Sequence, residues 1–183
     1  MRIPTDSSPI GLESASAPSH QEVTVSNVTP YDLQREQWIP QPMEDVFAFF
    51  ADAINLEAIT PPWLGFQILS PEPIVMAPGT LIEYRLRWHR CPIRWVTEIR
   101  RWDPPTSFID VQLRGPYHLW EHTHRFQAVD GGTRMFDVVR YALPFGFLGR
   151  MAHAWVVKAD LEGIFDYRAR KVSEILGNAC THA

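Results

Sequence analysis

Hydrophobic and polar residues alternate through the middle of the chain. Between Ile82 and Trp88, apolar side chains alternate with charged ones, a pattern typical of a β-strand with one buried and one wet face. The same period of two predicts further strands at 93–100, 107–113, 118–128 and 133–143. Proline- and glycine-containing turns separate them, at Cys91-Pro92, Asp103-Pro104-Pro105, Gly115-Pro116 and Asp130-Gly131-Gly132. The pattern predicts a run of antiparallel strands joined by short turns.

Different hydrophobic patterns, including helical ones, lie on either side of this run of predicted strands. Residues 31–39 form a predicted strand that ends at a proline, and apolar residues between Met43 and Phe50 then recur at helical spacing. A second short helix is predicted at 55–57, before Pro61-Pro62 removes the amide donors that a helix needs. The last element, a long helix with one apolar stripe, is predicted from about 147 to 176. This order indicates an α+β fold, with helices covering one face of the sheet.

The chain's ends differ from its middle. Residues 1–29 are rich in serine and proline and lack an apolar period, which predicts a disordered tail. Residues 30–177 are expected to form one folded domain, and 178–183 a short C-terminal tail. A chain of 183 residues with 45% hydrophobic content suits one such domain.

Charge and cysteine content exclude several classes of function. The 17 basic and 21 acidic residues give a net charge of -4, so we expect no nucleic-acid partner. Cys91 and Cys180 form no CxxC motif, which favours neither a disulfide scaffold nor a zinc ribbon. The sequence also shows no secretion signal and no apolar run long enough for an integral membrane segment. We therefore expect a soluble, cytoplasmic protein.

Aromatic residues make up 12% of the chain, including 7 Trp, which is more ring surface than a small core needs. Tyr84 and Trp95 fall on predicted inner faces, where they either fill the core or line a cavity. If Trp88 lies opposite Ile93, then Leu86 faces Trp95 and Tyr84 faces Thr97, so both strands place their apolar residues on one side.

The strand at 118–128 carries the richest chemistry. Alternate residues of a strand share a face, so four inner residues project together: Trp120, His122, His124 and Phe126. Closing the following turn with Ala128 opposite Thr133 places His124 across from Asp137 and Trp120 across from Tyr141.

A buried aspartate is costly unless it is paired, and an adjacent histidine can pair with it. This cluster is either a structural polar network or an acid/base and ligand-anchoring site, with His122, His124 and Asp137 as catalytic candidates. The paired histidines could also begin a zinc site with Asp137 as a further ligand, but zinc needs more ligands than the sequence places there. We therefore expect no metal.

Asp110 and Gln112 lie on the less apolar face of their strand, which predicts that they face solvent unless a bulge near Gly115-Pro116 reverses the parity. Asp110 is kept as a candidate ligand contact. The sequence contains no glycine-rich phosphate loop, nucleophile elbow or Cys–His couple, so no cofactor is expected.

Three segments resemble the helix-grip fold of the START/SRPBCC superfamily, which includes polyketide cyclase/dehydrase-like and coenzyme-Q-binding proteins. They are PQPMEDVFAFFADAINLEAITPPW, RGPYHLWEHTHRF with the hairpin GGTRMFDVVRYALP, and the terminal helix; the resemblance spans about 31–176. It implies a curved antiparallel sheet of about seven strands wrapped around the long helix, with two short helices after the first strand. It also implies an elongated cavity for lipids, quinones or polyketides, and identifies no nucleophile.

We therefore expect a module that binds a small hydrophobic ligand; the oligomeric state is left open. The residues expected to contact the ligand are Tyr84, Trp95, Asp110, Trp120, His122, His124, Phe126, Asp137 and Tyr141. The alternative is a cyclase/dehydratase-type enzyme that uses the His/Asp cluster in the same cavity. A third hypothesis is a protein-interaction partner that acts through the tail at 1–29.

Overall fold

A computed structural model describes residues 30–144, 151 and 156–177. Two sets of predictions lie outside the described residues: the tails at 1–29 and 178–183, and the part of the predicted last helix before residue 156, apart from residue 151. Within the described ranges, no helix has the length and apolar content needed to cross a membrane.

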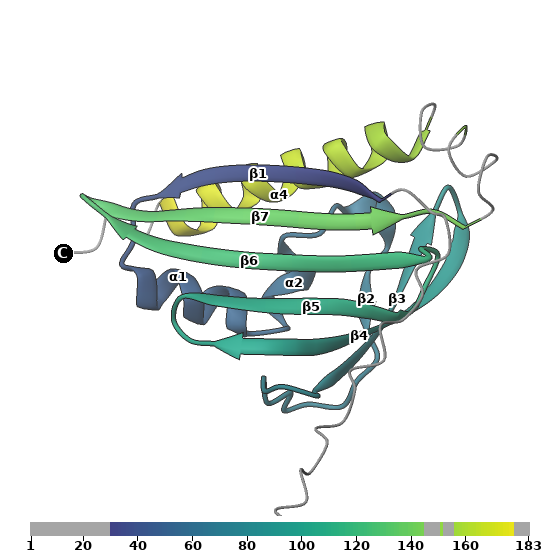
Figure 1. The fold of residues 1–183 in the computed structure, drawn as a ribbon, viewed down its shortest axis with the longest axis horizontal. Helices are drawn as coiled ribbons and strands as arrows, with labels where there is room; N and C mark the ends of the chain where they lie inside the picture. Colours follow the sequence, from purple (N-terminus) through teal and green to yellow (C-terminus); the bar gives the residue numbers. More distant parts are fainter. Residues whose placement is uncertain (1–29, 145–150, 152–155, 178–183) are drawn as a thin grey trace, which may run out of the picture.

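Seven strands form one antiparallel sheet in the order β1-β7-β6-β5-β4-β3-β2 (Figure 1). They are β1 (Tyr31–Ile39), β2 (Gln67–Ile68), β3 (Leu81–Trp88), β4 (Cys91–Asp103), β5 (Ser107–Arg114), β6 (Leu119–Val129) and β7 (Gly132–Ala142). The sequence pattern predicts all of these except β2, whose two residues are too few to show a period.

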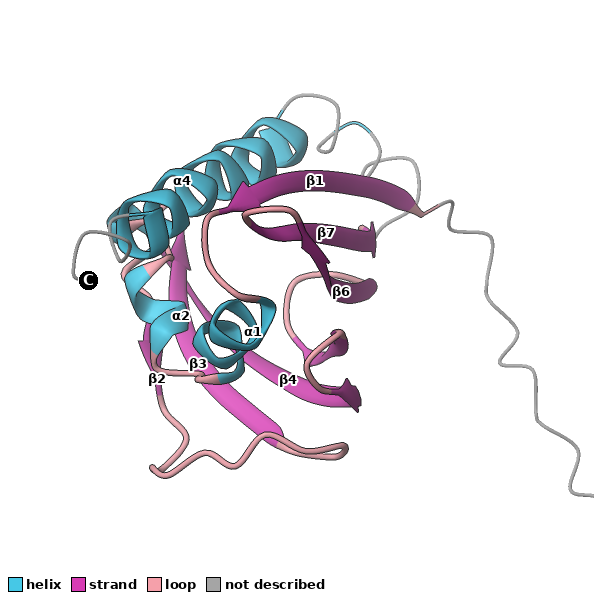
Figure 2. Cartoon of the chain, turned by 90° about the vertical axis from the view of Figure 1, so that its left-hand side faces the viewer, coloured by secondary structure: helices cyan, strands magenta, loops and turns pink. Residues whose placement is uncertain are grey.

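The sheet curls around the helices, which confirms the α+β helix-grip prediction (Figure 2). The helices are α1 (Met43–Ala51), α2 (Asn55–Ala58), the 3-10 turn η1 (Pro62–Leu64) and α4 (Lys158–Gly177). Helix α4 contacts β1 at one edge of the curved sheet and β3, next to the other edge. Gln37 of β1 donates to Ser173 of α4, and Trp88 of β3 donates to Asp160 of α4. The long helix therefore closes the open side of the sheet.

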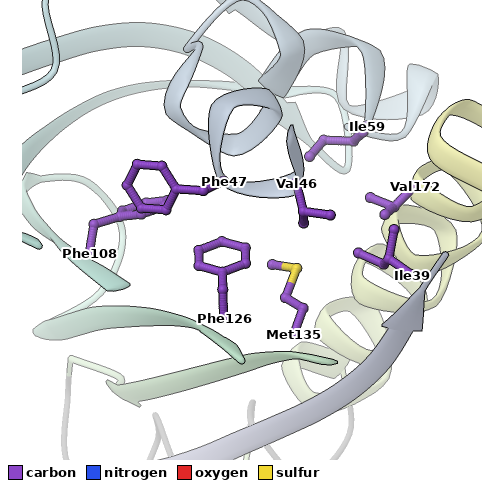
Figure 3. Packing of buried hydrophobic residues seen from close by; sticks show 8 residues of the cluster. All are labelled: Ile39, Val46, Phe47, Ile59, Phe108, Phe126, Met135 and Val172. Atoms are coloured by element: carbon purple, nitrogen blue, oxygen red, sulfur yellow. The ribbon is translucent and has the colours of Figure 1, made fainter. Parts of the chain in front are cut away.

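A hydrophobic core packs between the sheet, α1 and α4 (Figure 3). Val46 and Phe47 of α1 point toward Phe126 of β6 and Met135 of β7, and Val172 of α4 completes the layer. Glu44 and Asp45 occupy the first turn of α1, where their negative charges interact favourably with the helix dipole and stabilise the helix.

The predicted register of the β3–β4 hairpin is wrong by two residues. Trp88 pairs with Cys91 and Tyr84 with Trp95, so the turn is His89-Arg90 and not Cys91-Pro92. Both turn residues have positive φ, 47° and 73°, as a two-residue hairpin turn of the primed type requires. No glycine or asparagine marks this turn in the sequence. A shift of two residues preserves side-chain parity, so the predicted inner faces remain correct.

Replacing Arg90 by glycine is expected to raise the free energy of unfolding by up to about 1 kcal/mol, because glycine adopts positive φ without steric cost. Urea denaturation measures the change. Arg100→Gly, inside β4, is the control and is expected to destabilise the protein. Equal losses in both variants would show that the turn conformation carries no strain.

The orientation expected for Asp110 is also wrong. Asp110 pairs directly with His122 of β6, and directly paired residues share one face of a sheet. The side chain of Asp110 is therefore turned inward and only 15% exposed. Its inward charge is accommodated by the histidines, a compensation that counting apolar residues on β5 alone cannot reveal. Gln112 bonds the backbone of Tyr117.

Candidate functional site

Two adjoining cavities lie inside the curved sheet, the larger facing α4 and the smaller facing mainly α1 and α2. The larger has a volume of about 530 Å³ and the smaller about 120 Å³. Both are lined by Leu56, Tyr84, Trp120, His122 and Arg168. Most other residues around the larger cavity are apolar, and they come from β3, β4, the segment after β5, α4 and the residue before α4: Leu86, Trp88, Ile93, Trp95, Pro116, Tyr117, Leu161, Ile164, Phe165 and Val157.

Aromatic rings form one wall of the larger cavity. Trp95 packs edge-on against Trp120 with ring centroids 5.2 Å apart, and it stacks on Tyr84 at 5.9 Å. Thr97 satisfies the polar atoms of this wall: Trp95 Nε1 donates to Thr97 Oγ1, which also shares a hydrogen bond with the Tyr84 hydroxyl, each at 3.0 Å. The rings are thus held in place with their apolar surfaces toward the cavity.

Two histidines and two aspartates from β5, β6 and β7 form a buried cluster beside these cavities. His122 Nε2 donates to Asp137 Oδ1 at 3.0 Å, and His124 Nδ1 lies 2.8 Å from the same oxygen. The two imidazole centroids are 3.8 Å apart. On the opposite side, Asp110 Oδ2 lies 3.7 Å from His122 Nδ1 and 3.5 Å from His124 Nε2.

Burial and mutual charge shift the pKa values within the cluster. Burial, reinforced by the His124 charge, lowers the pKa of His122 and favours its neutral form. Burial alone would lower the pKa of His124 as well, but the carboxylates, Asp137 first, outweigh it and raise that pKa. Burial would raise the pKa of Asp137, yet the His124 charge and hydrogen bonds from both rings hold it well below its usual range. The cluster is therefore built around an ionised Asp137.

The structure brings most of the expected site residues together. Tyr84, Trp95, Trp120 and His122 line the larger cavity, while Asp110 and His124 line the smaller one. Asp137 lies behind the two imidazoles.

Phe126 and Tyr141 are placed differently. Phe126 packs in the core with Phe47, and Tyr141 is 2% exposed beside Val139. Neither residue lines the two cavities.

Arg168 of α4 is a site residue that sequence reasoning missed. It lines both cavities, with its Cζ 5.0 Å from the centroid of the Phe165 ring. Its Nε is buried and has no hydrogen-bond partner among the described residues. The available signal was an arginine within the predicted apolar stripe of the last helix. This side chain places positive charge beside the mostly apolar wall of the larger cavity.

Asp160 marks the edge of the larger cavity. Its Oδ2 accepts a hydrogen bond from Trp88 Nε1 at 2.6 Å and lies 2.9 Å from His89 Nε2. These contacts tie the first turn of α4 to the β3–β4 hairpin. Among the described residues, the group that could hold a metal ion is Asp110, His122 and His124, whose ligand atoms lie within 4.8 Å of one another.

Comparison with known families gives one match. Residues 39–163 match the family described as polyketide cyclase / dehydrase and lipid transport. No curated protein matches the chain.

Solved structures share the fold at low sequence identity. Protein Ms6760 from Mycobacterium smegmatis is 18% identical, with 80% of this chain and 90% of that chain covered and a TM-score of 0.59. TTHA0849 from Thermus thermophilus is 21% identical, with 79% and 99% covered and a TM-score of 0.57. A Rhodobacter sphaeroides protein is 20% identical, with 81% and 93% covered and a TM-score of 0.59. At these identities the likeness concerns the fold alone.

Proposed function

The chain belongs to the polyketide cyclase / dehydrase and lipid transport family, and on that premise we propose that it binds a small hydrophobic or aromatic molecule in the larger cavity. The observation that carries this proposal is an apolar space of about 530 Å³ with a wall of tryptophan and tyrosine rings. Cavities of roughly 300–1,000 Å³ with a few polar groups are typical of small-molecule sites. A lipid, quinone or polyketide-like ligand would match this shape and lining.

Arg168 narrows the chemistry of the proposed ligand. A buried N–H without a hydrogen-bond partner is costly, and a carboxylate, sulfonate or phenolate on the ligand that accepts from Arg168 Nε would offset that cost. Its position on the wall shared by both cavities leaves the ring-lined space for the apolar body. We therefore propose an apolar ligand with one acidic group.

A cavity-filling substitution tests where binding occurs. Leu86→Trp adds bulk to the wall of the larger cavity and is expected to weaken binding of 1-anilinonaphthalene-8-sulfonate at least about tenfold. Titrations monitor the emission of the bound dye. Its neutral counterpart, N-phenyl-1-naphthylamine, is expected to lose affinity equally, because both probes need the same volume.

Leu113→Trp is the matched control, since Leu113 is 52% exposed and lines neither cavity. It should leave both affinities unchanged. If Leu86→Trp also leaves them unchanged, the dyes bind elsewhere and the cavity proposal is wrong.

Catalysis of a cyclase or dehydratase type is the second candidate function. His122 lines both cavities, donates to Asp137, and has a pKa lowered by burial, which suits a general base. His122→Asn should then stop ring closure or loss of water in a ligand that the variant still binds, as mass spectrometry would detect. Recovery of every bound ligand unaltered from the wild-type protein would favour a carrier.

A further inference from the structure

Asp110, His122 and His124 bring three potential metal-ligand atoms close together beside the smaller cavity. Asp110 Oδ2 lies 3.7 Å from His122 Nδ1 and 3.5 Å from His124 Nε2, and all three ligand atoms fall within 4.8 Å of one another. Both distances to Asp110 are too long for a strong hydrogen bond. They are close to the separation of about 3.3–3.6 Å between ligand atoms in a tetrahedral site with metal–ligand bonds of about 2.0–2.2 Å.

The proton positions on His122 give a second reason to expect a cation at this cluster. A neutral imidazole carries one N–H, and His122 uses it from Nε2 in its bond to Asp137. Its Nδ1 then presents a lone pair toward the Asp110 carboxylate, so two acceptors face each other without a proton between them. A cation between these atoms would convert the repulsion into two coordinate bonds.

Asp137 completes the arrangement from behind. Its Oδ1 contacts the ring nitrogen of each histidine that faces away from Asp110, Nε2 of His122 and Nδ1 of His124. A carboxylate on the far side of a metal-ligating imidazole orients the ring and increases its basicity. Together Asp110 and Asp137 supply two negative charges to offset a divalent ion.

We propose that Asp110 Oδ2, His122 Nδ1 and His124 Nε2 bind one divalent transition-metal ion, with Zn²⁺ favoured by the nitrogen and oxygen ligands. The fourth position opens toward the smaller cavity of about 120 Å³, which can admit water or a ligand atom. The sequence-based expectation of no metal placed Asp110 in solvent, and its inward position supplies the ligand then lacking. The inference does not rest on the proposed hydrophobic ligand.

Metal binding by the tag-free full chain tests the site. After chelator treatment and dialysis, the protein is expected to take up one Zn²⁺ per chain, and Co²⁺ in its place should give the strong visible absorption of four-coordinate cobalt. Asp110→Asn should weaken Zn²⁺ binding at least about tenfold, as should His124→Ala. Competition with a chromophoric chelator measures the affinities.

Two further variants control for adventitious binding. Asp160→Asn removes the carboxylate beside His89, and Cys91→Ser removes an exposed thiol; both should retain full affinity. The wild-type measurement stands even if a cluster variant fails to fold. Uptake well below one ion per chain, Co²⁺ spectra typical of six-coordination, or equal affinity in folded Asp110→Asn would each overturn the proposal.

Discussion

Replacement of Asp137 by alanine is expected to lower the free energy of unfolding by about 3–5 kcal/mol, the largest stability effect we predict for a single substitution. The change removes the carboxylate that pairs with both buried imidazoles, His122 and His124. It leaves the ring nitrogens that face Asp137 without an acceptor inside a buried cluster. Urea denaturation at pH 6 measures the loss.

Asp166→Ala is the matched control, because its carboxylate is 59% exposed and pairs with Arg35 only at the surface. Such pairs contribute less than about 1 kcal/mol. A loss below that value for Asp137→Ala would contradict a paired, ionised cluster.

The pKa directions give this cluster a pH dependence. Asp137 has a lowered pKa, so its stabilising contribution is present above its unfolded pKa of about 4 and decreases as the pH falls below it. His124 has a raised pKa, so its contribution is full below about 6.5 and is lost as the pH rises through its folded value. The lowered pKa of His122 favours its neutral form and acts in the opposite sense to His124. The cluster should therefore stabilise the fold more at pH 6 than at pH 3.

The second large effect concerns ligand recognition. Arg168→Met is expected to weaken binding of 1-anilinonaphthalene-8-sulfonate about tenfold or more, because a buried hydrogen bond between charged groups contributes about 1.5–3 kcal/mol. N-phenyl-1-naphthylamine lacks only the sulfonate and should bind with nearly unchanged affinity. The ratio of the two affinities isolates the charge from the apolar contacts.

A stability measurement and a surface control variant distinguish a loss of ligand affinity in Arg168→Met from misfolding. Methionine has a similar length and removes the buried Nε–H that lacks a hydrogen-bond partner, so Arg168→Met should unfold at the same or higher urea concentration than the wild type. Arg170→Met removes an exposed guanidinium and should change neither affinity. Equal losses for both dyes in Arg168→Met would indicate a packing role, and unchanged affinity for the sulfonate would place its binding elsewhere.

The β6–β7 hairpin shows what this sequence predicts well. Asp130-Gly131-Gly132 marks its turn, and the alternation on both strands then gives the observed pairing of His124 with Asp137. The β3–β4 turn carries His89 and Arg90 at positive φ without a glycine, so its register could not be predicted in the same way.

Long-range pairing explains what the sequence did not reveal about the site. Asp110 lies on the less apolar face of β5, and only its partner His122 shows that this face is internal. Arg168 lies on the predicted apolar stripe of the last helix, but only the position of α4 shows that it lines a cavity together with Tyr84 and Trp120. Both polar residues become informative only after the sheet closes around the helix.

A crystal structure of the protein with 1-anilinonaphthalene-8-sulfonate tests the central claim most directly. The naphthalene ring should lie against the rings of Trp95 and Trp120, with a sulfonate oxygen within hydrogen-bond distance of the Arg168 guanidinium. A dye molecule bound only on the outer surface, with the larger cavity empty of it, would contradict the account.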